Sequence, residues 1–103
     1  MPVLEEILEE EYGRSVCLSR AMKEEYLLLP KGSVRTRVIR GHEYYYLNYR
    51  EGKKVRSDYI PASKVEEVRV KVKRRKVLKA ALREQEQVRR QIERVLGRRP
   101  HAE

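Results

Sequence analysis

The segment that decides the fold spans residues 33–60 and reads SVRTRVIRGHEYYYLNYREGKKVRSDYI. It contains three stretches rich in Val, Ile, Thr and Tyr, residue types that favour β-strands. These stretches are residues 33–40, 43–50 and 53–60. The links between them, residues 41–42 and 51–52, are two residues long and contain glycine, which is typical of tight hairpins. Because links this short force antiparallel pairing, the segment predicts a three-stranded antiparallel meander.

Both flanks of this segment carry the spacing of amphipathic helices. From residue 2 to about residue 28, apolar side chains recur every three or four positions, and Pro30 ends the pattern. After the third strand, Ser63 and Glu66 form the S-x-x-E pattern of a capping box, which opens a second periodic stretch. We therefore expect one α+β domain with an N-terminal helix, a three-stranded antiparallel β-meander and a long C-terminal helix. Its expected parts are an acidic helix at residues 1–29, the sheet at 33–60, a long basic helix at 63–97 and a tail at 98–103.

The predicted C-terminal helix is longer than the sheet it can cover. It would measure about 50 Å, whereas eight-residue strands span only about 25 Å. Its second half resembles a heptad repeat. The a and d positions would be Leu78, Ala81, Gln85, Val88, Ile92 and Val95. The part of this helix that extends beyond the sheet can pack on the N-terminal helix or on a second copy of the chain. We expect both, and therefore a homodimer with a coiled-coil-like element.

Charge is segregated along the 103 residues, which carry a net charge of +9. Residues 1–30 hold three basic and seven acidic side chains, a net charge of −4, whereas residues 31–103 hold 22 basic and nine acidic ones, a net charge of +13. Such asymmetry indicates an acidic partner for the basic part, most often nucleic acid. The alternative is that the positive charge merely keeps the protein soluble.

Several classes of protein are disfavoured by the sequence. No apolar run approaches the roughly 18 residues of a membrane span, and the acidic N-terminus is unlike a basic secretory signal. The lone Cys17 cannot form an internal disulfide, which fits a reducing cytoplasm. Neither His42 nor His101 has neighbours at metal-ligand spacing, and no phosphate-binding glycine motif occurs. We expect a cytoplasmic, non-enzymatic protein without a metal, cofactor or small-molecule substrate.

The outer strands carry the basic side chains of a candidate binding surface. We expect Arg35 and Arg37 of the first strand to share one face with Lys54 and Arg56 of the third, together with two tyrosines of the central strand. Which tyrosines join them depends on the register, since a slip of one residue inverts a strand. Guanidinium groups bind phosphates or guanine edges, and aromatic rings stack on bases. The alternatives are an acidic protein partner, or a face that is merely solubilised by good strand formers.

A second basic cluster lies between residues 71 and 79 of the predicted C-terminal helix, where it suits sequence-independent contacts with phosphates. The alternative is a solvated stretch of helix, and Arg98-Arg99 would either extend the cluster or belong to a frayed tail. The complete set of candidate nucleic-acid-binding residues is Arg35, Arg37, Tyr44, Tyr46, Lys54, Arg56, Lys71, Lys73, Arg74, Arg75, Lys76 and Lys79.

Four short motifs carry a resemblance to known families. They are LPKGS at residues 29–33, YYYL at 44–47, YREGK at 49–53 and SDYI at 57–60. They resemble a family of short uncharacterised prokaryotic proteins with an acidic leading helix, a Tyr-rich meander and a charged trailing helix, which implies the architecture but no activity. The chain is also similar to the arm-type DNA-binding domain of tyrosine recombinases, a three-stranded sheet followed by a helix. In that domain the sheet lies in the major groove; this chain departs from it in its leading helix and its longer trailing helix.

Taken together, these patterns predict a DNA-binding protein, with RNA as the less favoured ligand, that uses the basic sheet face and the basic helix cluster. The alternative is a protein–protein interaction module, antitoxin-like or an adaptor, that acts through its helices.

Overall fold

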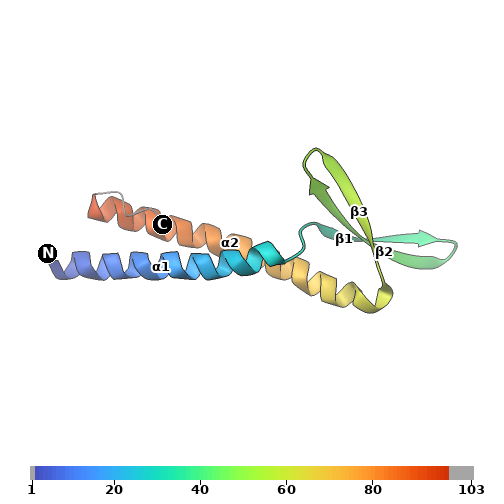
Figure 1. Cartoon of the computed structure of the whole chain (residues 1–103), viewed down its shortest axis with the longest axis horizontal. Helices are drawn as coiled ribbons and strands as arrows, with labels where there is room; N and C mark the ends of the chain where they lie inside the picture. Colours follow the sequence, from blue (N-terminus) through green and yellow to red (C-terminus); the bar gives the residue numbers. More distant parts are fainter. Residues whose placement is uncertain (1, 98–103) are drawn as a thin grey trace. The chain divides into compact units, whose positions relative to one another are not determined.

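The computed structural model describes residues 2–97, and it confirms the predicted α+β fold (Figure 1). The elements are α1 (Pro2–Leu28), β1 (Ser33–Ile39), β2 (His42–Glu51), β3 (Lys54–Ile60), a 3₁₀ turn (Ala62–Lys64) and α2 (Val65–Leu96). Gly13, a residue that disfavours helix, does not interrupt α1. The α-helix α2 begins two residues after Ser63, because the 3₁₀ turn precedes it. The predicted tail at 98–103, with Arg98-Arg99, lies outside the described residues.

The sheet is an antiparallel meander in the order β1-β2-β3. Its two turns have the predicted length of two residues, but each is displaced by one position, to residues 40–41 and 52–53. Arg40 and Gly41 both have positive φ, 53° and 81°, as a type I′ turn requires. Gly52 has a φ of 61° at the first central position of the second turn, the pattern of type II′. Both turn types match the right-handed twist of paired strands.

The link from α1 to β1 depends on a glycine. Gly32 has a φ of 112°, a conformation that side chains disfavour. A Cβ atom at this position would overlap the backbone carbonyl oxygen of Asn48 and lie 2.9 Å from the Cβ of Tyr49. The chain at the start of β1 can therefore approach the backbone of β2 this closely only because residue 32 has no side chain.

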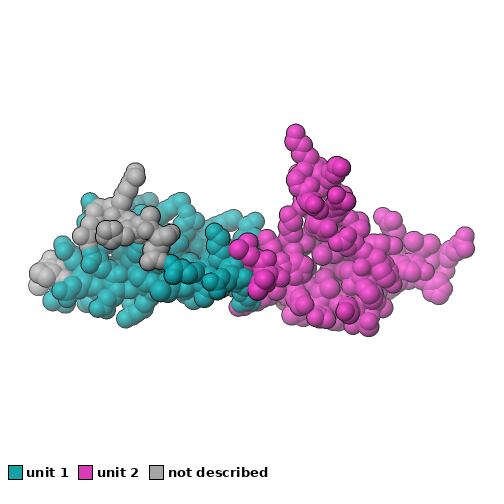
Figure 2. All heavy atoms as spheres, viewed as in Figure 1, with its two compact units in different colours: residues 1–26, 78–103 teal, residues 27–77 magenta. Residues whose placement is uncertain are grey.

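The chain divides into two compact units, coloured separately in Figure 2. The helical unit consists of residues 1–26 and 78–103, of which residues 2–26 and 78–97 are described. The sheet unit consists of residues 27–77, which include the whole meander and the first part of α2. Each unit has its own interior.

In the helical unit, α1 and the second half of α2 pack along a seam with heptad-like spacing. The more buried positions of α1 are Leu8, Tyr12, Ser15, Val16, Ser19, Met22 and Tyr26, and those of α2 are Leu78, Ala81, Leu82, Gln85, Arg89, Ile92, Glu93 and Leu96. Leu78, Ala81, Gln85 and Ile92 are thus among the more buried positions, as predicted. The prediction is wrong for Val88 and Val95, which are exposed, because Arg89 and Leu96 occupy those places.

The middle of this seam is polar. Ser15 is 4% exposed, and its hydroxyl donates to Oε1 of Gln85 at 2.8 Å. The Arg89 guanidinium donates to Oγ of Ser15 at 3.0 Å and to Oγ of Ser19 at 2.6 Å. Burial, together with the negative charge of Glu93, raises the pKa of Tyr12 nearby. Because these hydrogen bonds form only when α1 and α2 are aligned in this way, they favour a single register of the two helices.

The interior of the sheet unit lies where the end of β3 meets the start of α2. Ile60, Val65 and Val72 are each at most 6% exposed. Across this interior, the guanidinium carbon of Arg69 lies 5.7 Å from the ring centroid of Tyr45. The side of the sheet that carries Tyr45 and Ile60 is therefore the side that meets α2. Among the described residues, no helix combines the length and apolar character needed to cross a membrane.

Candidate nucleic-acid interface

The strand register sorts the sheet side chains into two faces. Arg35 pairs with Tyr46, Arg37 with Tyr44, and Tyr46 in turn with Tyr59. Directly paired residues of antiparallel strands project to the same side. The face that carries these residues, here called the arginine face, consists of Ser33, Arg35, Arg37, Ile39, His42, Tyr44, Tyr46, Asn48, Arg50, Val55, Ser57 and Tyr59. The other face, called the mixed face, consists of Val34, Thr36, Val38, Glu43, Tyr45, Leu47, Tyr49, Glu51, Lys54, Arg56, Asp58 and Ile60.

The two faces differ in charge. The arginine face carries three arginines and no carboxylate among its twelve strand positions, whereas the mixed face carries two basic and three acidic side chains. On the mixed face, Nε of Arg56 lies 3.4 Å from a carboxylate oxygen of Glu51. The arginine face therefore has an uncompensated positive charge, and the mixed face is close to neutral.

Aromatic rings lie among the arginines on the arginine face. The rings of Tyr46 and Tyr59 meet edge to face, with centroids 5.9 Å apart and an interplanar angle of 70°. The guanidinium carbon of Arg37 lies 5.4 Å from the Tyr46 centroid, a cation–π distance. Next to these rings, Ser57 donates a hydrogen bond to Oδ1 of Asn48 at 2.7 Å. These contacts hold rings and a guanidinium group in fixed positions on an exposed surface.

The tyrosines of the mixed face serve a different purpose, because carboxylates bind their hydroxyl groups. Tyr45 donates to Glu43 at 3.0 Å, and this hydrogen bond is the main reason that the pKa of Tyr45 is raised. A hydrogen bond to Asp58 likewise raises the pKa of Tyr49. These hydroxyl groups are therefore occupied within the sheet.

The expectation that Lys54 and Arg56 share a face with Arg35 and Arg37 is wrong. Two-residue turns join residues whose numbers differ by three, so odd positions of β1 and β3 always pair with even positions of β2. Lys54 and Arg56 occupy even positions and therefore project to the mixed face. Sorting the outer strands by apolar character alone overlooked this parity.

The same parity brings two further residues to the arginine face that sequence reasoning did not include in the site. Arg50 comes from the end of β2 and Tyr59 from β3, and both are exposed. The signal that would have found them is the two-residue length of the links, which determines the parity even when the turn is misplaced by one position. Arg35, Arg37, Tyr44 and Tyr46, by contrast, lie together on one face, and the register thus decides which tyrosines join the arginines, a point that the sequence left open.

The basic residues of α2 do not form a uniform cluster. The ammonium group of Lys71 lies 3.0 Å from Glu67, and its hydrogen bond lowers the pKa of that carboxyl group. Arg75 is half-buried and donates to the backbone carbonyl of Leu29 at 2.8 Å, just beyond the end of α1. Both side chains thus have partners within the protein. The other members, Lys73, Arg74 and Lys76 in the sheet unit and Lys79 in the helical unit, have exposed side chains.

Within residues 2–97, the structure contains no group of three or more His, Cys, Asp or Glu side chains placed to hold a metal ion.

Comparison with known proteins gives a family and no characterised relative. A family model described as a domain of unknown function, DUF6788, matches residues 3–70, which contain α1 except for its first residue, the whole sheet and the start of α2. No curated protein and no solved structure matches the chain.

Proposed function

The chain belongs to the DUF6788 family, and we propose that it binds nucleic acid, DNA in the first place, through the arginine face of its sheet. The observation that carries this proposal is the absence of any carboxylate on the face that holds Arg35, Arg37 and Arg50. A face of this charge attracts polyanions, and phosphate contacts supply most of the affinity of non-specific binding. The tyrosines between the arginines add ring faces and hydroxyl groups for further contacts.

The dimensions of the sheet support DNA as the ligand. Neighbouring strands lie about 4.8 Å apart, so three backbones span about 10 Å. The major groove of B-form DNA is about 12 Å wide and accepts β-structures, whereas the major groove of A-form RNA is too narrow for side chains to read. The similarity to the arm-type domain of tyrosine recombinases supports the same choice. In the groove, arginines would contact phosphates or guanine edges, and Asn48 is of the residue type that binds adenine edges.

The exposed lysines of α2 in the sheet unit, Lys73 and Lys76, extend the proposal to the phosphate backbone. Among the described residues, neither makes an ion pair. A compact ammonium group on a flexible stem suits phosphates, which carry no sequence information. We assign them a supporting role, in contrast to the arginine face, which would determine where the protein binds.

The experiment that tests this proposal compares two double variants with equal loss of charge. Binding of the full chain to a labelled DNA duplex is measured by fluorescence anisotropy at several salt concentrations. For R35A/R37A we expect binding weakened about 10-fold or more at low salt, and a slope of log affinity against log salt reduced by about two units, because two phosphate contacts are lost. The matched control K54A/R56A removes two basic residues of the mixed face and should change the affinity less than about threefold.

Four results would contradict the proposal. Equal weakening by the two double variants would mean that binding follows net charge and not the arginine face. Affinity independent of salt would exclude phosphate contacts as its basis. Absence of duplex binding by the folded wild-type protein at low salt would overturn the function itself. Tighter binding to a single strand or to RNA than to the duplex would overturn the choice of ligand.

The second candidate function is a protein–protein interaction module that acts through the helices. The observation that favours it is the exposure of large apolar side chains on the helical unit, Leu18 and Val95 among them.

A further inference from the structure

The helical unit carries apolar side chains that its own seam leaves uncovered. On α1 they are Val3, Leu4, Ile7 and Leu18, and on α2 they are Val88 and Val95. Leu18 is 47% exposed and Val95 is 65% exposed, whereas Leu78 in the seam is 2% exposed. We call five of them, Leu4, Ile7, Leu18, Val88 and Val95, the lateral stripe. Exposed apolar residues that are clustered on a surface indicate interaction sites, whereas single exposed apolar residues are common and need no explanation.

The members of the lateral stripe lie on the same side of the helix pair. Leu18, Val88 and Val95 each directly precede a residue of the seam, namely Ser19, Arg89 and Leu96. Leu4 lies two heptads before Leu18 and therefore on the same side of α1, and Ile7 lies one turn from Leu4. The hydrogen bonds from Tyr12 to Glu93 and from Ser15 to Gln85 show that the two helices are antiparallel. Two antiparallel helices are related by a two-fold axis that is perpendicular to the plane containing both helices. A rotation about this axis exchanges the helices but keeps each side of that plane in place. Residues at equivalent positions beside the seam, such as Leu18 and Val88, therefore lie on the same side of the helix pair.

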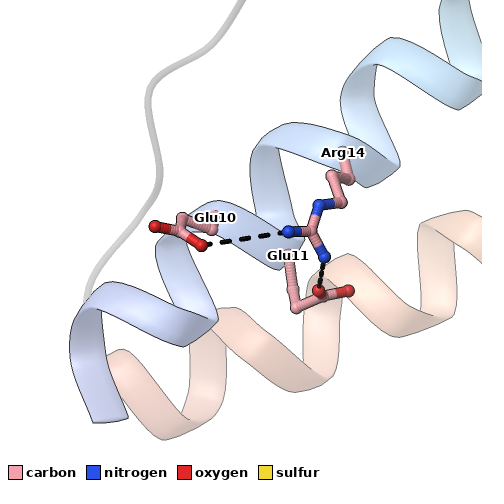
Figure 3. Close-up of polar contacts among 3 residues, drawn as sticks. All are labelled: Glu10, Glu11 and Arg14. Carbon is pink, nitrogen blue, oxygen red and sulfur yellow. Dashed lines mark hydrogen bonds and ion pairs between the residues drawn. The ribbon is translucent and has the colours of Figure 1, made fainter. Parts of the chain in front are cut away.

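The gap in the stripe between Ile7 and Leu18 is polar but internally paired. Arg14 forms an ion pair with Glu11, and its second terminal nitrogen lies 3.9 Å from Glu10 (Figure 3). The Arg14 guanidinium group thus has partners along α1, and the three side chains together keep a net charge of −1 in the middle of the stripe.

We propose that the lateral stripe is covered by a second copy of this chain, so that two helical units form a symmetric four-helix bundle. Charge complementarity selects this occupant. The helix α1 carries seven carboxylates and three basic side chains, a net charge of −4, whereas residues 78–97 carry five basic and three acidic ones, a net charge of +2. In a second copy turned about an axis parallel to the helices, each acidic α1 lies against the basic α2 segment of its neighbour.

This arrangement also matches the apolar residues along the helices. Since Tyr12 is level with Glu93 and Ser15 with Arg89, Leu18 lies within about one turn of the level of Val88, and Ile7 lies close to the level of Val95. A neighbour in this orientation would bring Leu18 against Val88 and Ile7 against Val95 of the second copy. The proposal concerns the helical unit alone and does not depend on nucleic-acid binding.

Sedimentation equilibrium of the full chain tests the proposal directly. We expect wild-type protein at about 50 µM to have twice the 12.3 kDa mass of one chain. L18E should raise the dissociation constant of the dimer about 100-fold, because each dimer loses two buried leucines. The matched control C17E adds the same charge at the adjacent exposed position and should change the constant less than about threefold. A monomeric wild-type protein, or equal effects of L18E and C17E, would overturn the proposal.

The orientation is tested by disulfide formation between chains on a C17S background. Chains carrying L18C or V88C are oxidised separately and as a mixture, after their helical content has been checked by circular dichroism. We expect a covalent dimer that links one chain of each kind in the mixture. Covalent dimers from L18C alone would mean that α1 packs on α1, and the absence of any covalent dimer would place the contact elsewhere; either result overturns the arrangement.

Discussion

The two faces of the sheet are built from the same three strands, yet they have opposite character. On the arginine face, guanidinium groups and rings such as Tyr46 and Tyr59 contact each other and no carboxylate is present. On the mixed face, Arg56 is paired with Glu51 and the tyrosine hydroxyl groups are bound by carboxylates. The composition of the sheet as a whole conceals this difference. A net charge becomes a binding surface only when the register places like charges on the same side.

The largest expected effect comes from the residue that allows β1 to join β2. We predict that G32A lowers the free energy of unfolding by about 3 kcal/mol or more, because a Cβ atom would overlap the backbone of Asn48 at a φ that alanine disfavours. The measurement is urea unfolding followed by circular dichroism. Since both faces depend on this pairing, the variant should also lose the distinction between them.

The control for this variant is G13A, at an exposed position of α1 with no atom near the added methyl group. It should raise the stability by up to about 1 kcal/mol, because alanine favours a helix over glycine. A G32A variant as stable as wild type would mean that β1 pairs with β2 in another way.

A double-mutant cycle sharpens the contrast between the faces. Tyr46 and Tyr59 are in contact on the arginine face, so we expect Y46A and Y59A to be coupled by about 0.5–1.5 kcal/mol in urea unfolding. The matched pair Y49A and Y59A crosses from one face to the other, and its coupling should be near zero. Equal coupling in the two cycles would contradict the assignment of the faces.

The smallest effect concerns alkaline pH. Hydrogen bonds to Glu43 and Asp58 raise the pKa of Tyr45 and of Tyr49 in the folded protein. The stabilisation that they provide is therefore complete below the unfolded pKa, near 10, and is lost as the pH rises through the folded values. In an ultraviolet titration of the phenol groups, Y45F/Y49F should lose two of the tyrosines that titrate late, while Tyr12, whose pKa is also raised, should still titrate late.

The control for the titration is Y44F/Y46F, which removes two tyrosines of the arginine face. It should leave the late part of the titration in place. If Y44F/Y46F instead removes the tyrosine signal that appears at the highest pH, then Glu43 and Asp58 do not raise the pKa values of Tyr45 and Tyr49.

Much of the fold could be predicted from local sequence. The two-residue links with Gly41 and Gly52 predicted the meander, and the change from a period of two to one of three or four predicted the helices. Which tyrosines share a face with Arg35 and Arg37 was left open, and the register of the strands places Tyr44 and Tyr46 there. Lys54 and Arg56 were misplaced because apolar character was weighed above turn length, although the turn length itself determines the parity of the strands.

The sequence by itself determined the order and type of the elements, the length of both turns and therefore which side chains share a sheet face, since all of these follow from local backbone geometry. Only the tertiary structure decided the roles of Arg75 and Arg89, two basic residues that bind groups on α1 or just beyond its end. It also decided that Leu82 and Arg89 face the seam while Val88 faces outward. A helix with apolar residues on several sides can turn more than one row inward, and its packing partner, far away in the sequence, selects the row.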